Sequence, residues 1–236
     1  MALEENLEIV RQRIRTACER CGRNPESVTL VAVVKGHPPE VVKQAFECGV
    51  RIFAENKVQE AKAKIPLCPS GITWHLIGHL QTNKAKDAVQ LFDMIHSVDS
   101  LKLAEEINKR SQQIRKKIPV LLEINVSGEL SKFGYAPSIL AGEIKKIAEL
   151  PSLDIQGLMT MAPFVDNPEL TRPFFRKLRE LKNEYEQILN KPLPHLSMGM
   201  TNDFEIAIEE GATMVRIGTA IFGERSGWKY STPQND

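Results

Sequence analysis

Eight short apolar segments alternate with amphipathic segments along the chain, and this alternation constrains the fold more than any other feature. The apolar segments predict strands over residues 28–34, 50–53, 73–77, 94–98, 119–125, 154–160, 194–197 and 214–218. The intervening segments predict helices over residues 39–48, 58–64, 83–91, 101–113, 138–150, 169–189 and 203–210, with a short helix after the last strand. Eight such units favour an α/β fold of one closed parallel (β/α)8 barrel of the TIM type.

An open, doubly wound sheet would show a similar alternation. No G-x-G-x-x-G motif follows the first strand, however, which removes the main support for a dinucleotide-binding sheet. Apolar residues at spacings of three or four also predict an extra N-terminal helix within residues 1–22. We therefore expect a single barrel domain over residues 1–236, with a frayed tail at residues 228–236.

The charge balance excludes a general attraction to polyanions. Lysine and arginine number 31 against 30 aspartates and glutamates, so the net charge is +1. This gives no global field for nucleic acid or an anionic membrane, and any anionic ligand needs a local site. The N-terminus is acidic and no apolar run reaches membrane-spanning length, so we expect a soluble, cytoplasmic protein.

Four cysteines are too few to build a disulfide framework in a chain of this length. Cys18 and Cys21 form a CxxC pair, but the pair ends a predicted helix, and Cys48 and Cys68 stand apart from it. His75 has no second ligand at metal-site spacing and is predicted to be a hydrogen-bonded core histidine. We predict no metal site.

Lys35 closes the first apolar segment and is the first candidate functional residue. Strand alternation places Lys35 on one face with Val31 and Val33, at the rim of the barrel interior. Burial penalises the ammonium form, and the neutral amine can attack an aldehyde. A surface lysine at the start of a loop is the alternative interpretation.

Polar residues also follow the second strand, where Glu55 and Asn56 offer hydrogen-bonding groups at the mouth of the barrel. These two residues are equally well explained as caps of the next helix.

Small-residue turns follow the seventh and eighth strands. The first runs from Ser197 through Met198 and Gly199 to Thr201, and the second contains Gly218 and Thr219. Phosphate sites in such barrels frequently lie after strands seven and eight. The two turns therefore predict an anion site.

Arg216 shares a strand face with Gly218 and should point into the barrel. A buried guanidinium needs a partner, and inward-facing Glu123 is one candidate. The other is the pyridine nitrogen of a cofactor, to which a permanently protonated arginine donates, weakening the ring as an electron sink. Both interpretations can hold together.

A reactive lysine beside an anion site points to pyridoxal phosphate. The chain also resembles the pyridoxal phosphate homeostasis protein (YggS/PROSC) family, which shares its barrel with alanine racemase. The resemblance covers almost the whole chain and is carried by residues 30–35, 53–60, 74–84, 157–161, the Ser197 turn and residues 215–223.

By this resemblance, Lys35 forms the Schiff base (internal aldimine) with pyridoxal 5'-phosphate and Arg216 faces the pyridine nitrogen. Ser197 and the loop at Gly218 and Thr219 bind the phosphate, and Asn56 neighbours the ring. The resemblance also implies that Met198 and Gly199 contribute backbone NH groups, while Thr201 either contacts the phosphate or caps the helix. The chain departs from the family at Val34, Gly36, His37 and Ala54, which affects pocket polarity more than cofactor binding.

Known members of this family bind the cofactor without established turnover, and they influence vitamin B6 and amino-acid balance. In alanine racemase a tyrosine from outside the barrel supplies the second base. Here Tyr135, Tyr185 and Tyr230 have no second domain to carry them to the site. The resemblance thus implies a non-catalytic carrier and regulator, a monomer, whose partners include apo-forms of pyridoxal phosphate enzymes.

Three other functions stay open. A racemase-like pyridoxal phosphate enzyme would use the same site, a cofactor-free Schiff-base aldolase would share the lysine and the phosphate loops, and a purely structural interaction module would not need Lys35.

Overall fold

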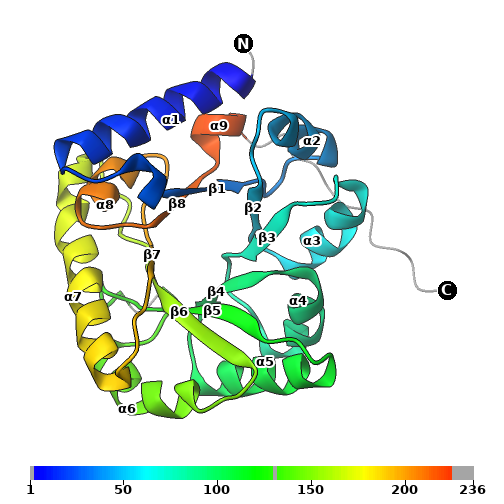
Figure 1. The fold of residues 1–236 in the computed structure, drawn as a ribbon, viewed down its shortest axis with the longest axis vertical. Coiled ribbons are helices and arrows are strands. Elements are labelled where there is room, and N and C mark those ends of the chain that lie inside the picture. Colours follow the sequence, from blue (N-terminus) through cyan, green and yellow to red (C-terminus); the bar gives the residue numbers. More distant parts are fainter. Residues whose placement is uncertain (1–2, 130–131, 225–236) are drawn as a thin grey trace.

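The barrel is closed, and its strands follow one another in sequence order (Figure 1). The computed structural model describes residues 3–129 and 132–224. The strands are β1 (Thr29–Val33), β2 (Ile52–Glu55), β3 (Thr73–Leu76), β4 (Met94–Val98), β5 (Ile118–Glu123), β6 (Leu153–Met159), β7 (His195–Ser197) and β8 (Met214–Ile217). All neighbouring pairs are parallel, and β8 pairs with β1 to close the ring. The predicted (β/α)8 architecture is confirmed.

Helices surround the barrel (Figure 1). They are α1 (Leu3–Arg20), α2 (Pro39–Glu47), α3 (Val58–Lys64), α4 (Ala85–Leu91), α5 (Leu101–Gln113), α6 (Pro137–Ala148), α7 (Arg172–Leu189), α8 (Phe204–Glu209) and α9 (Thr219–Phe222). The extra helix, α1, precedes the first strand and lies beside α8 and α9. Its Leu7, Val10 and Ile14 are buried, as their spacing predicted.

The position predicted for the second strand was wrong by two residues. The strand starts at Ile52 because the amide of Val50 donates to Ala45 O at 3.0 Å and so closes the last turn of α2. Its end moves to Glu55, whose carboxylate pairs with a buried lysine on α3.

Strand alternation divides the apolar residues into two cores. Val31 and Val33 lie inside the barrel, where they pack with Ala54, Ile77 and other inward residues. Ala32 and Val34 face outward and join the larger core between sheet and helices. This alternation confirms the predicted inward face of the first strand. Lys35, two residues after Val33, continues this face at the rim of the barrel.

The CxxC pair lies at the end of α1, where Cys18 is buried and Cys21 Sγ donates to Ala17 O at 3.2 Å. No helix among the described residues has the length and apolar character needed to span a membrane. The predicted tail at residues 228–236 and Tyr230 lie outside the described residues.

Candidate functional site

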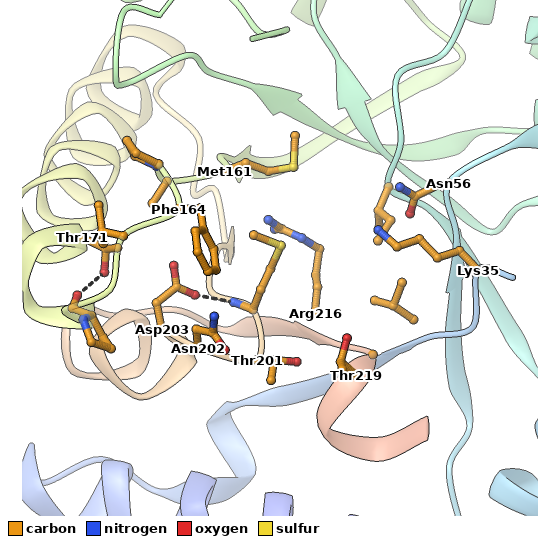
Figure 2. Close-up of a pocket in the computed structure, with 18 residues that line it drawn as sticks. Lys35, Asn56, Met161, Phe164, Thr171, Thr201, Asn202, Asp203, Arg216 and Thr219 are labelled. Carbon is orange, nitrogen blue, oxygen red and sulfur yellow. Dashed lines mark hydrogen bonds between the residues drawn. The ribbon is translucent and has the colours of Figure 1, made fainter. Parts of the chain in front are cut away.

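A pocket of about 360 Å³ lies where the strands run into the following loops. Its wall comes from the ends of six strands: Val33 at the end of β1 and Lys35 after it; Asn56 after β2; Ile77 after β3; residues 161–165, Pro168 and Thr171 after β6; residues 200–203 after β7; and Arg216, Gly218 and Thr219 at β8. Figure 2 shows Arg216 between Lys35 and Asn56 on one side and Phe164 and Asp203 on the other. This volume lies in the range of small-molecule and cofactor sites.

Lys35 occupies the corner of a tight turn directly after β1. The amide of His37 donates to Val34 O at 3.1 Å, and Gly36 has a φ of 72°. A hydrogen bond from the fourth residue to the first, with positive φ at the third, is the pattern of a type II turn, which favours glycine at that position. Lys35 is partly buried, and its side chain extends toward Asn56 (Figure 2).

Asn56 lies on the pocket wall, and the capping explanation for it and Glu55 was wrong. Helix α3 begins after Lys57, and no side chain caps it. Asn56 Oδ1 is buried and has no hydrogen-bond partner among the described residues. A buried amide oxygen without a partner costs free energy, so this position fits a polar group of a ligand.

Gly78 allows the loop after β3 to approach Asn56 closely. A Cβ added at Gly78 would lie 2.2 Å from Asn56 O, which no side chain can accommodate without movement of the backbone. The backbone at the Asn56 wall therefore depends on a glycine in the loop after β3.

Arg216 is almost fully buried, and two hydrogen bonds orient its guanidinium. Nη1 donates to Ser197 Oγ at 2.7 Å, and Nη2 donates to Thr160 O at 2.8 Å. Burial lowers the pKa of Arg216 to about 10, so the group stays charged at neutral pH. The pairing predicted with Glu123 is an electrostatic attraction inside the barrel, while the hydrogen bonds go to Ser197 and Thr160.

A chain of hydrogen bonds continues from Arg216 into the barrel interior. Ser197 Oγ lies 3.0 Å from His96 Nδ1, and His96 Nε2 lies 3.0 Å from His75 Nδ1. With a neutral His96, one ring nitrogen donates and the other accepts in these two contacts, whichever way the hydrogens point.

Burial lowers the pKa of both histidines, to about 4 for His75, which favours their neutral state. His75 is indeed a hydrogen-bonded core histidine, as predicted.

Three of the predicted phosphate residues lie behind the pocket wall. Ser197 is fully buried against Arg216 and His96, and the amide of Met198 donates to Met214 O at 3.2 Å. Gly199 has a φ of 91°, and a Cβ there would lie 2.6 Å from Ala207 Cβ. None of the three lines the pocket within the described part of the chain.

Thr201, Gly218 and Thr219 do line the pocket. Thr201 Oγ1 accepts from the amide of Ala220 at 3.4 Å, so the loops after β7 and β8 are tied together. Asp203 occupies the N-cap position of α8 but its side chain makes no capping bond to the helix; its Oδ1 accepts from the amide of Met200, in the preceding turn, at 2.7 Å. The two predicted turns therefore meet on one side of the pocket.

The loop after β6 is a part of the site that sequence reasoning missed. Met161 and Phe164 lie on the pocket wall, and Phe164 is 81 % exposed. Met161 belongs to a segment that carries the family resemblance, but nothing in the sequence assigned Phe164 to the site.

Comparison with known proteins shows which family the chain resembles in sequence. The sequence profile described as "Alanine racemase, N-terminal domain" matches residues 2–226. A pyridoxal phosphate homeostasis protein of Aquifex aeolicus is 48% identical over 222 residues, which cover 94% of this chain and 97% of that protein. The Escherichia coli K12 protein of the same name is 41% identical over 231 residues, with 94% and 97% coverage.

Solved structures agree with these sequence matches. PipY of Synechococcus elongatus PCC7942, solved with pyridoxal phosphate bound, is 36% identical and covers 94% of this chain and 100% of that chain, with a TM-score of 0.83. An alanine racemase of Clostridium difficile 630 is 18% identical, with a TM-score of 0.71 over 94% of this chain and 57% of that chain, and this likeness shows the fold alone. The sequence matches to the two homeostasis proteins span nearly the full length of both sequences. The chain therefore belongs to the family of pyridoxal phosphate homeostasis proteins.

Proposed function

We propose that this chain, as a single barrel domain, holds pyridoxal phosphate covalently on Lys35 and serves vitamin B6 and amino-acid homeostasis as a non-catalytic carrier. The observation that carries the proposal is one pocket that combines a primary amine, a buried guanidinium and an unpartnered amide oxygen, at Lys35, Arg216 and Asn56. The similarity to PipY, solved with pyridoxal phosphate bound, supports it.

The residues present fit this cofactor. When bound, it supplies an aldehyde carbon, a pyridine ring and a phosphate. Lys35 offers an amine that attacks an aldehyde carbon, with water as the leaving group. Arg216 remains charged and is held by Ser197 and Thr160. Toward the pocket it can therefore act only as a hydrogen-bond donor, never as an acceptor.

We assign the phosphate to the side of the pocket where the two turns meet. Thr201 and Thr219 offer hydroxyl groups there, and Gly218 permits close approach of the backbone. Ser197, Met198 and Gly199 support this side from behind, Ser197 through its bond to Arg216.

The positions of the two tyrosines that the structure describes support carriage over turnover. Tyr185 is buried in α7, where its hydroxyl donates to Pro137 O at 3.0 Å, and burial raises its pKa to about 12. Tyr135 is also buried, and burial raises its pKa well above the ordinary range. Neither lines the pocket, so neither is placed to serve as the second base of a racemase.

We further propose that the protein works as a cytoplasmic monomer that passes its cofactor to apo-forms of pyridoxal phosphate enzymes. Light scattering of the purified protein tests the oligomeric state. Mixing loaded protein with an apo-enzyme, followed by assay of that enzyme, tests transfer.

The experiment that tests cofactor binding is a visible spectrum with added pyridoxal phosphate, followed by borohydride reduction and peptide mapping. We expect reduction to attach the cofactor to Lys35 in the wild type and in Lys57→Ala, a control at an exposed lysine beside Asn56, but not in Lys35→Ala. Fully folded wild type without any attachment would contradict the proposal and favour a cofactor-free aldolase. Sustained exchange of amino-acid α-protons, abolished in Lys35→Ala, would instead establish an enzyme.

A further inference from the structure

A cluster of three buried charged side chains, Glu55, Glu60 and Lys64, lies behind the Lys35 turn. The Lys64 side chain is fully buried, and its Nζ donates to Glu60 Oε1 at 3.1 Å and to Glu55 Oε1. It also donates to the carbonyl oxygen of Val34 at 2.7 Å. These three acceptors match the three hydrogens of an ammonium group.

Stability alone is a weak explanation for such a cluster. Removing three ionisable groups from water is costly, and replacing a buried ion pair by apolar residues is often neutral or stabilising. The proposed function does not use these three residues directly. Their role has to be sought in what they hold.

The cluster anchors both peptide groups that flank Lys35. On the N-terminal side, the carbonyl of Val34 accepts from Lys64 Nζ. On the C-terminal side, the amide of Gly36 donates to Glu60 Oε1. Anchoring the peptide planes before and after a residue restricts its φ and ψ, and therefore the direction of its Cα–Cβ bond.

The same cluster also reaches the neighbouring part of the pocket wall, at the end of β2. Glu55, which ends β2, immediately precedes Asn56, and its carboxylate is tied to Lys64 on α3. One set of charges thus connects the turn that carries Lys35 with the strand end that carries Asn56.

We propose that Glu60 and Lys64 are positioning residues for Lys35. They hold its turn so that the amine points toward the pocket, and so they set the rate and the equilibrium of covalent attachment. This inference rests on the proposed function, because it concerns the attachment of pyridoxal phosphate to Lys35.

Glu60 provides the sharpest test because one substitution removes its acceptor and another, of nearly the same shape, keeps it. Glu60→Ala removes the acceptor for the Gly36 amide, whereas Glu60→Gln keeps an oxygen in place. Asn108→Ala is a matched control: Asn108 Oδ1 accepts from the amide of Ser152 at 2.9 Å, and this residue of α5 is largely buried and does not line the pocket.

The first measurement is the borohydride-stable attachment of pyridoxal phosphate to Lys35, at a temperature where every variant is folded. We expect attachment in Glu60→Ala to be weaker and slower by about tenfold, the effect of one lost charge-assisted hydrogen bond. Glu60→Gln should restore most of the wild-type attachment, and Asn108→Ala should match the wild type. If Glu60→Ala fails to fold, Glu60→Asp, which withdraws the carboxylate by one methylene, takes its place.

A second measurement follows the reactivity of the Lys35 amine toward trinitrobenzenesulfonate in protein without cofactor, with the labelled peptide mapped. We expect a changed labelling rate at Lys35 in Glu60→Ala, restored in Glu60→Gln. Wild-type attachment and labelling in Glu60→Ala would overturn the positioning role while leaving the proposed function intact. Absence of attachment in the wild type would overturn the proposed function, and labelling would then decide the positioning role on its own.

Discussion

Arg216 shows how neighbouring residues can orient a binding group in the absence of a ligand. Its two hydrogen bonds, to Ser197 and Thr160, leave the remaining N–H groups for the pocket that it lines. Ser197 is held in turn by His96. Because these contacts already fix the guanidinium, it should lose little conformational freedom on binding.

Ser197→Ala tests this orientation. Removing the hydroxyl deprives Arg216 of one acceptor, so we expect the affinity for pyridoxal phosphate to fall about fivefold, the effect of roughly 1 kcal/mol. Absorbance titration measures the dissociation constant. Ser111→Ala is the control, because Ser111 is fully buried and its Oγ has no hydrogen-bond partner among the described residues. Equal affinities in the two variants would contradict the orienting role.

Glu123 should make stability depend on pH. Burial, aided by Asp99 and opposed by Arg216, raises the pKa of Glu123 from about 4.5 to about 7. A raised carboxyl pKa means that the folded state holds the proton more tightly than the unfolded state. This contribution is therefore fully present at low pH and is lost as the pH rises toward and through 7.

Glu123→Gln removes this dependence. We expect the stability of this variant relative to wild type, measured as the difference in the free energy of unfolding, to be about 2 kcal/mol higher at pH 8 than at pH 5. Urea denaturation at both pH values measures the difference. Glu149→Gln, at an exposed position after α6, should show no such trend. A Glu123→Gln difference that does not change with pH would show that the carboxyl ionises normally.

The positions of Lys35, Asn56 and Arg216 at the pocket could be predicted from the sequence, because they follow from strand ends and strand alternation. The position of Ser197 could not be predicted in this way. Its strand pairs with β8 so that Ser197 lies opposite Met214, two residues before Arg216. Ser197 therefore lies one layer deeper in the barrel than the pocket wall, and the register between two strands is not written in either strand alone.

At the scale of elements, the walls of the pocket depend on how closely successive strands and loops approach one another. Gly78, after β3, lies against the backbone of Asn56, after β2. The sequence showed a glycine there but not its neighbour. The same limit applies to α3: its bounds were predicted correctly, but the pairing of its Lys64 with Glu55 depends on tertiary packing.

Gly78→Ala should disturb this wall. Because its Cβ would lie 2.2 Å from Asn56 O, we expect a loss of roughly 3 kcal/mol in the free energy of unfolding, together with weaker cofactor binding. Gly142→Ala in α6 is the matched change: no atom lies within 4 Å of its new Cβ, and alanine favours a helix by about 1 kcal/mol. Thermal and urea denaturation should give opposite signs for the two variants. A neutral Gly78→Ala would show that the loop can move away freely.

At the scale of the whole molecule, closure of the sheet brings the first and last strands together. Thr29 pairs with Met214 and Ala32 with Ile217, so the Lys35 turn and the loop at Gly218 become neighbours although they are far apart in the sequence. The eightfold alternation predicted the units of this barrel. The alternation did not by itself distinguish a closed barrel from an open sheet, because both arrangements place helices between parallel strands.

Ligand binding should stabilise this closed structure as a unit. With pyridoxal phosphate at about 100 times its dissociation constant, linkage predicts roughly 2.7 kcal/mol of stabilisation, or a rise of about 5–10 °C in Tm for a chain of this size. Differential scanning calorimetry measures the shift. Lys35→Ala should lose most of it, and an equal shift in that variant would place the dominant binding energy outside the covalent bond.

The buried charges behind Lys35 also bear on protein engineering. A lysine grafted alone onto the first strand of another (β/α)8 barrel would lack the anchors that α3 supplies to its two peptide groups. The smallest portable unit is therefore the contiguous segment from β1 to the end of α3, residues 29–64, which contains the turn, both carboxylates and the buried ammonium. A transplanted reactive amine should be moved together with this whole segment rather than as a point substitution.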